Sequence, residues 1–128
     1  MSDVASDEQI IPPGTLGVIA LFLMQAGWPC EQTGDPMLLR SQFQGQHGEW
    51  TCLAHVRPDT DQCLFYSVAP LRAPEVLRPA VAEYLTRANW GLILGNFELD
   101  YSDGEVRFKT SLQLNGTPLA SELLHPLI

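Results

Sequence analysis

The stretch over residues 87–112 constrains the fold most, because it reads as a β-hairpin whose register the residues themselves specify. Asp103-Gly104 is typical of a two-residue type I′ turn, in which both central residues need positive φ and glycine takes it without steric cost. With this turn at the tip, one face carries an apolar pair and the other carries two opposite-charge pairs: Leu99 with Phe108, Asp100 with Arg107 and Glu98 with Lys109. A slip of one residue would destroy both patterns. The sequence therefore predicts a half-buried antiparallel hairpin, entered through Gly91 and Gly95.

Two acidic residues of this hairpin resemble the paired carboxylates of general acid–base catalysis. Glu98 and Asp100 lie two residues apart, on one face of the strand. Their expected partners Lys109 and Arg107 would hold both carboxylates ionised and satisfied. Because such cross-strand ion pairs are ordinary stabilisers of sheets, structural pairing is favoured over catalysis.

An N-terminal helix is predicted over residues 13–26 or 15–26, with Gly27 in the left-handed position that ends many helices. The side chains of this helix are apolar nearly all round: Leu16, Val18, Ile19, Leu21, Phe22, Leu23 and Met24. One sheet face cannot cover such a helix on every side. We therefore expect a second covering element or a dimer interface, and Leu16, Ile19 and Leu23 are candidate protein-binding residues.

The remaining segments complete an α+β pattern. Alternation predicts strands over residues 37–44, 49–57 and 63–69, and the third is apolar on both sides and so central. A second helix is predicted over 74–89, with Pro79 splitting off a short leading turn. Its expected core-facing stripe is Leu77, Val81, Tyr84, Leu85 and Ala88. After the hairpin, Thr117-Pro118 predicts the N-cap and first position of a short last helix.

The expected fold class is thus α+β, in the order helix, three-stranded antiparallel meander, helix, two-stranded hairpin and short helix. Residues 1–12 combine acidic residues and serines ahead of two prolines, so they read as a disordered N-terminal arm. Residues 13–128 are expected to form a single domain, because a chain of this length buries enough surface to fold without a metal or disulfide.

Charge excludes several classes of partner. Seven basic and 15 acidic residues give a formal net charge of −8 at pH 7, which opposes nucleic-acid binding because phosphate contacts need clustered lysine and arginine. The first basic residue is Arg40, so no basic region precedes the apolar run over 18–24, and that run is too short to span a bilayer. We expect a cytoplasmic protein that binds no membrane.

The cysteines and histidines carry no strong sign of metal or catalytic chemistry. Cys30, Cys52 and Cys63 are odd in number and lack zinc-site spacing, so buried free thiols are expected and no cofactor is implied. A nucleophilic triad of Cys52, His55 and Asp100 is disfavoured because Cys52 and His55 point to opposite faces of a regular strand. The sequence also lacks GxGxxG, P-loop and G-x-S-x-G motifs. A non-enzymatic protein is predicted.

Several motifs occur together in a characteristic order: AGWP at 26–29, GEWTC at 48–52, FYSVAP at 65–70, RPAVAEYLTRAN at 78–89, GLILGNFELD at 91–100 and DGEVRFKTS at 103–111. From about residue 16 to residue 112, the chain resembles the YbjN family of bacterial proteins, described as sensory transduction regulators. The resemblance implies a fold similar to that of type III secretion chaperones, which act as homodimers, and implies no known reaction. Family members often continue beyond the equivalent of Ile128 into a further helix, so a shortened or brief last helix is implied here.

Large aromatic residues fill cores and also form the central contacts of interfaces. Trp90 lies at a helix-to-strand junction, where a side chain reaches the surface, so Trp90 and Tyr66 join the candidate protein-binding residues. The predicted function is a chaperone-like or adaptor protein, a homodimer, that binds an apolar segment of a client protein. It would serve as an assembly or secretion factor, for example of a large complex such as a carboxysome, and no residue identifies the client. The alternative is a sensory transduction regulator with a small ligand in an apolar pocket.

Overall fold

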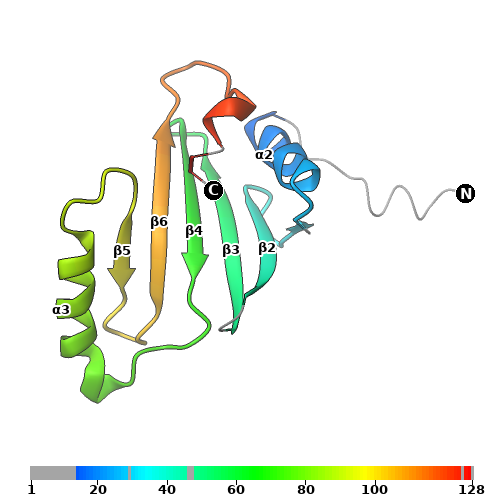
Figure 1. Cartoon of the computed structure of the whole chain (residues 1–128). Coiled ribbons are helices and arrows are strands. Elements are labelled where there is room, and N and C mark those ends of the chain that lie inside the picture. The colour runs from blue at the N-terminus through cyan, green and yellow to red at the C-terminus, as the bar shows by residue number, and fades with distance from the viewer. Residues whose placement is uncertain (1–13, 29, 46–47, 125, 128) are drawn as a thin grey trace, which may run out of the picture.

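The computed structural model describes residues 14–28, 30–45, 48–124 and 126–127. Within these residues the chain forms a six-stranded antiparallel sheet in the order β1-β2-β3-β4-β6-β5 (Figure 1). The strands are β1 Glu31–Gln32, β2 Leu38–Gly45, β3 Gly48–Arg57, β4 Gln62–Val68, β5 Asn96–Leu99 and β6 Val106–Gln113. The helical elements are α2 Gly14–Gln25, the 3₁₀ turn η1 Glu75–Leu77, α3 Arg78–Asn89 and the 3₁₀ turn η2 Ser121–Leu123. The α+β class is confirmed, and the predicted arm over 1–12 lies outside the described residues.

Helix α2 ends as the sequence predicts. Gly27 has φ of 84°, and its N–H donates to the carbonyl of Met24 at 3.1 Å. The N–H of Trp28 donates to the carbonyl of Leu23 at 2.9 Å. These two bonds form the Schellman motif, which satisfies carbonyls that the last helical turn leaves unpaired.

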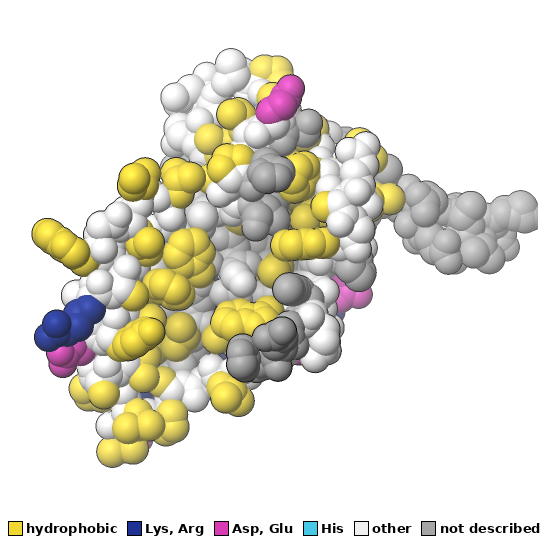
Figure 2. Space-filling model, in the orientation of Figure 1, with side chains coloured by type: hydrophobic (Ala, Val, Ile, Leu, Met, Phe, Trp, Pro, Cys, Tyr) yellow, Lys and Arg dark blue, Asp and Glu magenta, His cyan; other side chains and the backbone are white. Residues whose placement is uncertain are grey.

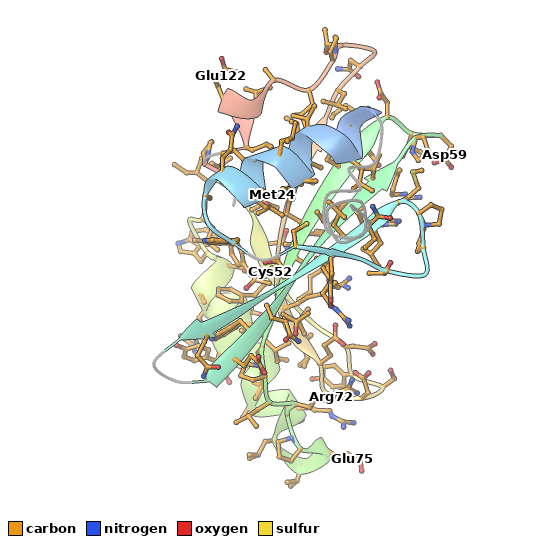
Figure 3. All side chains as sticks on the ribbon, turned by 90° about the vertical axis from the view of Figure 1, so that its right-hand side faces the viewer. Met24, Cys52, Asp59, Arg72, Glu75 and Glu122 are labelled. Atoms are coloured by element: carbon orange, nitrogen blue, oxygen red, sulfur yellow. The ribbon has the colours of Figure 1, made fainter. Side chains whose placement is uncertain are left out.

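The main core lies between α2 and one face of the sheet. Leu16, Ile19 and Leu23 of α2 are buried there. Their partners come from the strands and from the C-terminal segment: Leu39, Ala54, Val56, Cys63, Phe65, Leu114, Leu119 and Leu124. The second covering element expected for this apolar helix is therefore supplied by the chain's own C-terminal segment. Figure 3 shows α2 lying across the strands.

Helix α3 lies beside β5 at the sheet edge rather than over the core face (Figure 1). The short leading turn η1 confirms the predicted effect of Pro79, which stands in the first turn of α3. Leu85 is buried, but Tyr84 and Leu77 are exposed, so the predicted core stripe is wrong at these two positions. The physical reason is that α3 packs on a single strand, which covers a narrower stripe of the helix than a sheet face would.

The hairpin forms, but its predicted register is wrong by two residues. Phe97 lies opposite Phe108, Glu98 opposite Arg107 and Leu99 opposite Val106. The connection is a four-residue turn over 101–104, because the N–H of Asp100 donates to the carbonyl of Glu105 at 2.9 Å. Gly104 has positive φ, 81°, as predicted, whereas Asp103 does not. A shift of two keeps every side chain on its predicted face, since alternation along a strand has a period of two.

The shift changes the ion pairs. Asp100 is not a cross-strand neighbour of Arg107; it belongs to the turn, and its Oδ1 accepts hydrogen bonds from the N–H and hydroxyl of Ser102. Glu98 instead takes both cations, with Arg107 Nε at 2.7 Å and Lys109 Nζ at 2.9 Å.

The predicted start of the last helix at Thr117-Pro118 is also wrong. The 3₁₀ turn η2 begins at Ser121. Thr117 instead takes part in a turn, in which its N–H donates to the carbonyl of Leu114 at 3.0 Å and its hydroxyl bonds the same carbonyl. A side chain that pairs with a preceding carbonyl in this way stabilises a turn in place of a helix N-terminus.

Candidate apolar binding site

A cavity of about 460 Å³ opens on the sheet face that carries α2, beside the helix. Its floor follows from the strand register, which aligns Ser41, Cys52 and Ser67 in one row across β2, β3 and β4. The row closer to the core aligns Leu39, Ala54 and Phe65. Three small side chains in the outer row leave the centre of the sheet hollow where the residues of α2 no longer cover it.

Large apolar side chains form the walls of this cavity. They come from α2, the segment after α2, the sheet, the loop between α3 and β5, and the C-terminal segment: Leu23, Trp28, Trp50, Phe65, Leu94, Phe108, Pro126 and Leu127. Phe108 is held by an edge-to-face contact with Phe97, with ring centroids 4.9 Å apart and planes at 69°. Figure 2 shows hydrophobic side chains gathered across the middle of this face, with charged side chains near its margins.

The polar groups of the cavity are few and uncharged. Ser41 is 3% exposed, and its Oγ has no hydrogen-bond partner within the described part of the chain. Thr110 is satisfied, because its hydroxyl donates to the carbonyl of Leu127 at 2.8 Å. Burial raises the pKa of the Cys52 thiol, and a hydrogen bond with Ser67 acts in the opposite direction. The Cys52 thiol is therefore protonated at neutral pH and a poor nucleophile.

The loop over residues 90–94, between α3 and β5, extends this apolar surface outward. Trp90 is 90% exposed and Ile93 is 94% exposed, so both side chains lie almost entirely in solvent. Leu94 lies at the other end of the loop and contributes to the cavity wall. Gly91, inside the loop, and Gly95, directly after it, have positive φ of 86° and 80°. We refer to residues 90–94 as the Trp90–Leu94 loop.

The opposite face of the sheet carries the charged residues. Burial acts to raise the pKa of Glu98, but hydrogen bonds from Lys109 and Arg107, together with their charges, outweigh it and hold the pKa below its usual range. The Arg107 guanidinium also lies 4.2 Å from the centroid of the Tyr66 ring. A carboxylate held ionised by two cations is poorly suited to accept or deliver protons at neutral pH. Among the described residues, no group of three or more His, Cys, Asp or Glu side chains is placed to hold a metal ion.

The family model of YbjN, described as "Putative bacterial sensory transduction regulator", matches residues 15–127. The chain belongs to the YbjN family. The solved crystal structure of YbjN from E. coli, described as a putative transcription regulator, is similar with a TM-score of 0.64 and 14% sequence identity. The match covers 91% of this chain and 81% of that one, and at such low identity it shows a shared fold. No curated protein matches the sequence. In this YbjN-family chain, no described helix has the length and apolar character needed to cross a membrane.

In the YbjN-family fold of this chain, the predicted protein-binding residues do not lie together on one surface. Leu16, Ile19 and Leu23 are buried in the core of this chain, so they are structural and do not form an accessible surface, although Leu23 borders the cavity. Tyr66 also borders the cavity, but alternation along β4 places its ring on the opposite face, against Arg107. The exposure of Trp90 is confirmed. Its role in binding stays a prediction.

Sequence reasoning missed the cavity itself. The sequence does contain the small residues that form the cavity floor. Alternation places Ser41 on the apolar face of β2 between larger residues, and Cys52 and Ser67 occupy matching positions on β3 and β4. A buried serine in an apolar row costs free energy unless something pairs with it. Recognising the row requires the register across three strands, which sequence alternation within one strand does not supply.

Proposed function

We propose that this YbjN-family protein is a non-enzymatic, chaperone-like or adaptor protein that holds an apolar segment of a client protein. The observation that carries the proposal is a continuous apolar surface, formed by the open cavity and the neighbouring Trp90–Leu94 loop. Exposed aromatic and aliphatic side chains beside a hollow are the features that protein-binding sites use for their central contacts.

The charge distribution agrees with this proposal. A net charge of −8 keeps the molecule soluble while it exposes apolar side chains. None of the described ion pairs involves a residue that lines the cavity; examples are Glu98 with Arg107 and Lys109 on the opposite sheet face, and Glu83 with Arg87 on α3. The client segment would therefore be held by apolar contacts, in a homodimeric protein of the cytoplasm. Clients open to this site include a secretion substrate, a signalling protein and a subunit of a large assembly such as a carboxysome.

The test uses the tagged full chain to capture proteins from the source cell, with identification by mass spectrometry and repetition of the capture with the purified client. Trp90→Ala should lower the affinity for that client about 30-fold, the effect of removing a central interface aromatic. Val76→Ala is the matched control, because Val76 is 83% exposed but lies in η1, before the opposite end of α3. Equal binding by wild type and Trp90→Ala would contradict the proposal.

A second candidate is a regulator that senses a small ligand in the cavity. The observation that favours it is the cavity of about 460 Å³, whose mostly apolar lining with few polar side chains is typical of sites for small organic molecules. Native mass spectrometry of the protein purified from its source cell separates the two candidates. A stoichiometric bound small molecule supports the regulator, whereas retention of a protein segment supports the adaptor.

A further inference from the structure

We infer that two copies of this chain pair through the free half of strand β2, residues 41–45, and form one continuous antiparallel sheet. This inference rests on the homodimer named in the proposed function and supplies its interface. Three properties of the free half lead to it: outward-facing backbone groups without a neighbouring strand, a sequence without charge, and a register in which the strand is complementary to itself.

The first property is an open sheet edge. Strand β1 pairs with β2 only at Leu39 and Arg40, and no other described strand lies on that side of β2. In Figure 1, no helix or strand lies beyond the lower half of β2, towards its connection with β3. Trp28, shortly before β1, lies on the α2 face instead, where it borders the cavity and its N–H donates to the carbonyl of Leu23. The free half of β2 is therefore accessible from the side.

Two residues of the free half have backbone groups that point away from β3. The N–H of Val56 donates to the carbonyl of Met37, its cross-strand neighbour, at 2.9 Å. In an antiparallel pair such hydrogen-bonded positions alternate, so the odd-numbered residues of β2 bond to β3 and the even-numbered ones face the edge. Gln42 and Gln44 therefore direct their N–H and C=O groups outward, beyond the end of the pairing with β1. Exposed edges of this kind readily pair with another strand.

The second property is the lack of charge. Residues 41–48 contain no lysine, arginine, aspartate or glutamate, although the whole chain has a net charge of −8. Residues close to a two-fold axis lie near their own copies, so a charged strand would repel itself there. Edge strands that avoid pairing typically carry lysine or proline, and the free half has neither. A second copy therefore meets no electrostatic repulsion between the paired strands.

The third property is a register that pairs the free half with itself. Gln42 lies opposite Gln44 of the partner subunit, and two-fold symmetry generates the reverse pair. Because both residues face outward, each pair exchanges N–H···O=C bonds in both directions. A shift of two residues either places the partner strand on Arg40, where β1 already pairs, or moves Gln42 past the end of the partner's β2.

The side chains suit this register as well. Alternation places those of Gln42 and Gln44 on the face opposite α2, and both residues are exposed. The sheet already contains a cross-strand glutamine pair, in which Nε2 of Gln62 donates to Oε1 of Gln113 at 2.9 Å. The same amide-to-amide hydrogen bond would form in each pair across the interface.

The opposite edge of the sheet limits this pairing to two copies. Helix α3 lies beside β5, and the side-chain amide of Asn89 pairs with the backbone of Phe97. Within the described residues, β5 thus offers no comparable free edge, so the sheet ends as a dimer and does not grow into a fibre. The two-fold axis is perpendicular to the sheet, and both cavities open on the same face of the dimer.

The first test compares two substitutions at Gln44 in the full chain. Gln44→Pro removes the outward N–H but no bond to β3, and proline is tolerated on edge strands. We expect it to raise the dissociation constant of the dimer at least about 30-fold, because the interface loses a backbone hydrogen bond in each symmetry-related pair. Gln44→Ala, the matched control, keeps the N–H and should raise the constant less than about fivefold. Sedimentation equilibrium gives both constants, and circular dichroism checks that each variant folds.

The second test is a cross-link that reports the register and does not depend on the proline variant. Under oxidation, a mixture of the Gln42→Cys and Gln44→Cys proteins should form a covalent dimer, because Cα atoms of a hydrogen-bonded pair lie about 5.5 Å apart, within disulfide range. Neither variant alone should form it, since residue 42 lies opposite residue 44 and not opposite itself. Mass spectrometry of the linked peptides, with the wild type as control, separates this bond from links through the native cysteines.

These measurements separate the inference from the proposed function. A wild type that stays monomeric at tens of micromolar, a dimer that persists in folded Gln44→Pro, or a mixture without the cross-link between residues 42 and 44 would overturn the inference. A monomeric wild type whose client binding is weakened by Gln44→Pro would place a client strand on this edge and would also overturn it. The client proposal is decided separately, by the effect of Trp90→Ala on client binding.

Discussion

Replacing Gly104 by alanine should destabilise the protein strongly, for two independent reasons. Gly104 has φ of 81°, a conformation that costs a residue with a Cβ about 1–2 kcal/mol. An added Cβ would also lie 2.2 Å from the carbonyl oxygen of Ala73, where the backbone is held by the hydrogen bond from Ala73 N–H to the Gly104 carbonyl at 2.8 Å. Overpacking of this kind costs a further 1–3 kcal/mol or so. We expect a total loss of about 2–5 kcal/mol, a large part of the stability of an ordinary domain.

Gly116→Ala isolates the first of these reasons. Gly116 has φ of 80°, but an added Cβ would meet no heavy atom within 4 Å. This variant should therefore lose only about 1–2 kcal/mol. Urea unfolding followed by circular dichroism gives both free energies, provided that the m-value stays constant. Equal destabilisation by the two substitutions would refute the close approach of Ala73 to the hairpin turn.

Three further predictions concern stability and assembly. Glu98→Gln should reduce the fall in the free energy of unfolding at acidic pH. Folding lowers the pKa of Glu98, so the ionised carboxylate contributes about 1 kcal/mol or less of stability above about pH 4.3, the pKa of an unfolded glutamate. This contribution is lost as the pH falls through the lowered pKa of the folded state. Urea unfolding at pH 7 and pH 3 checks this, with Glu83→Gln on α3 as the control. Leu119→Ala should cost about 2–5 kcal/mol of unfolding free energy because Leu119 is buried in the core shared with α2, whereas Leu123→Ala, at 47% exposure, should cost less than about 1 kcal/mol in the same urea experiment. The predicted homodimer should scatter light as twice the 14.2 kDa chain, and a 14.2 kDa species at tens of micromolar would contradict it.

Local rules predicted most of the secondary structure. The Schellman motif at Gly27 follows from one glycine after an apolar helix, and the strand over Gln62–Val68 is central because both of its sides are apolar. The missing element was β1, whose two residues carry no periodic pattern. Such a short strand is specified by its partner β2 rather than by its own sequence.

The hairpin shows why an apparently fixed register can still be wrong. A shift of two residues keeps charged residues opposite charged ones and apolar residues opposite apolar ones. These patterns therefore determine on which sheet face each side chain lies, but they do not determine its neighbour on the other strand. What decides it is the turn: Asp100 accepts hydrogen bonds from Ser102, and the added turn residues move Glu98 opposite Arg107. Aspartate and serine side chains often hydrogen-bond to backbone groups of a turn, and the prediction of a two-residue turn did not take this into account.

The candidate site was only half predictable, because it depends on tertiary arrangement. Exposure of Trp90 follows from its place at a junction. The burial of Leu16, Ile19 and Leu23 depends on the C-terminal segment, whose Leu119 and Leu124 close over α2 from a distant part of the chain. The cavity likewise needs three strands in register before Ser41, Cys52 and Ser67 meet.

The side chain of Asn89 has a consequence for how a partner can be recognised. Its Oδ1 accepts a hydrogen bond from the N–H of Phe97 at 2.7 Å, and its Nδ2 donates to the carbonyl of Phe97 at 3.1 Å. The side-chain amide of Asn89 thus pairs with the outward-facing N–H and carbonyl of Phe97 on β5, as the backbone of a neighbouring strand would. A peptide cannot extend the sheet at this residue by main-chain pairing, which would be indifferent to its sequence. At this residue, a bound peptide would therefore be recognised through contacts with its side chains.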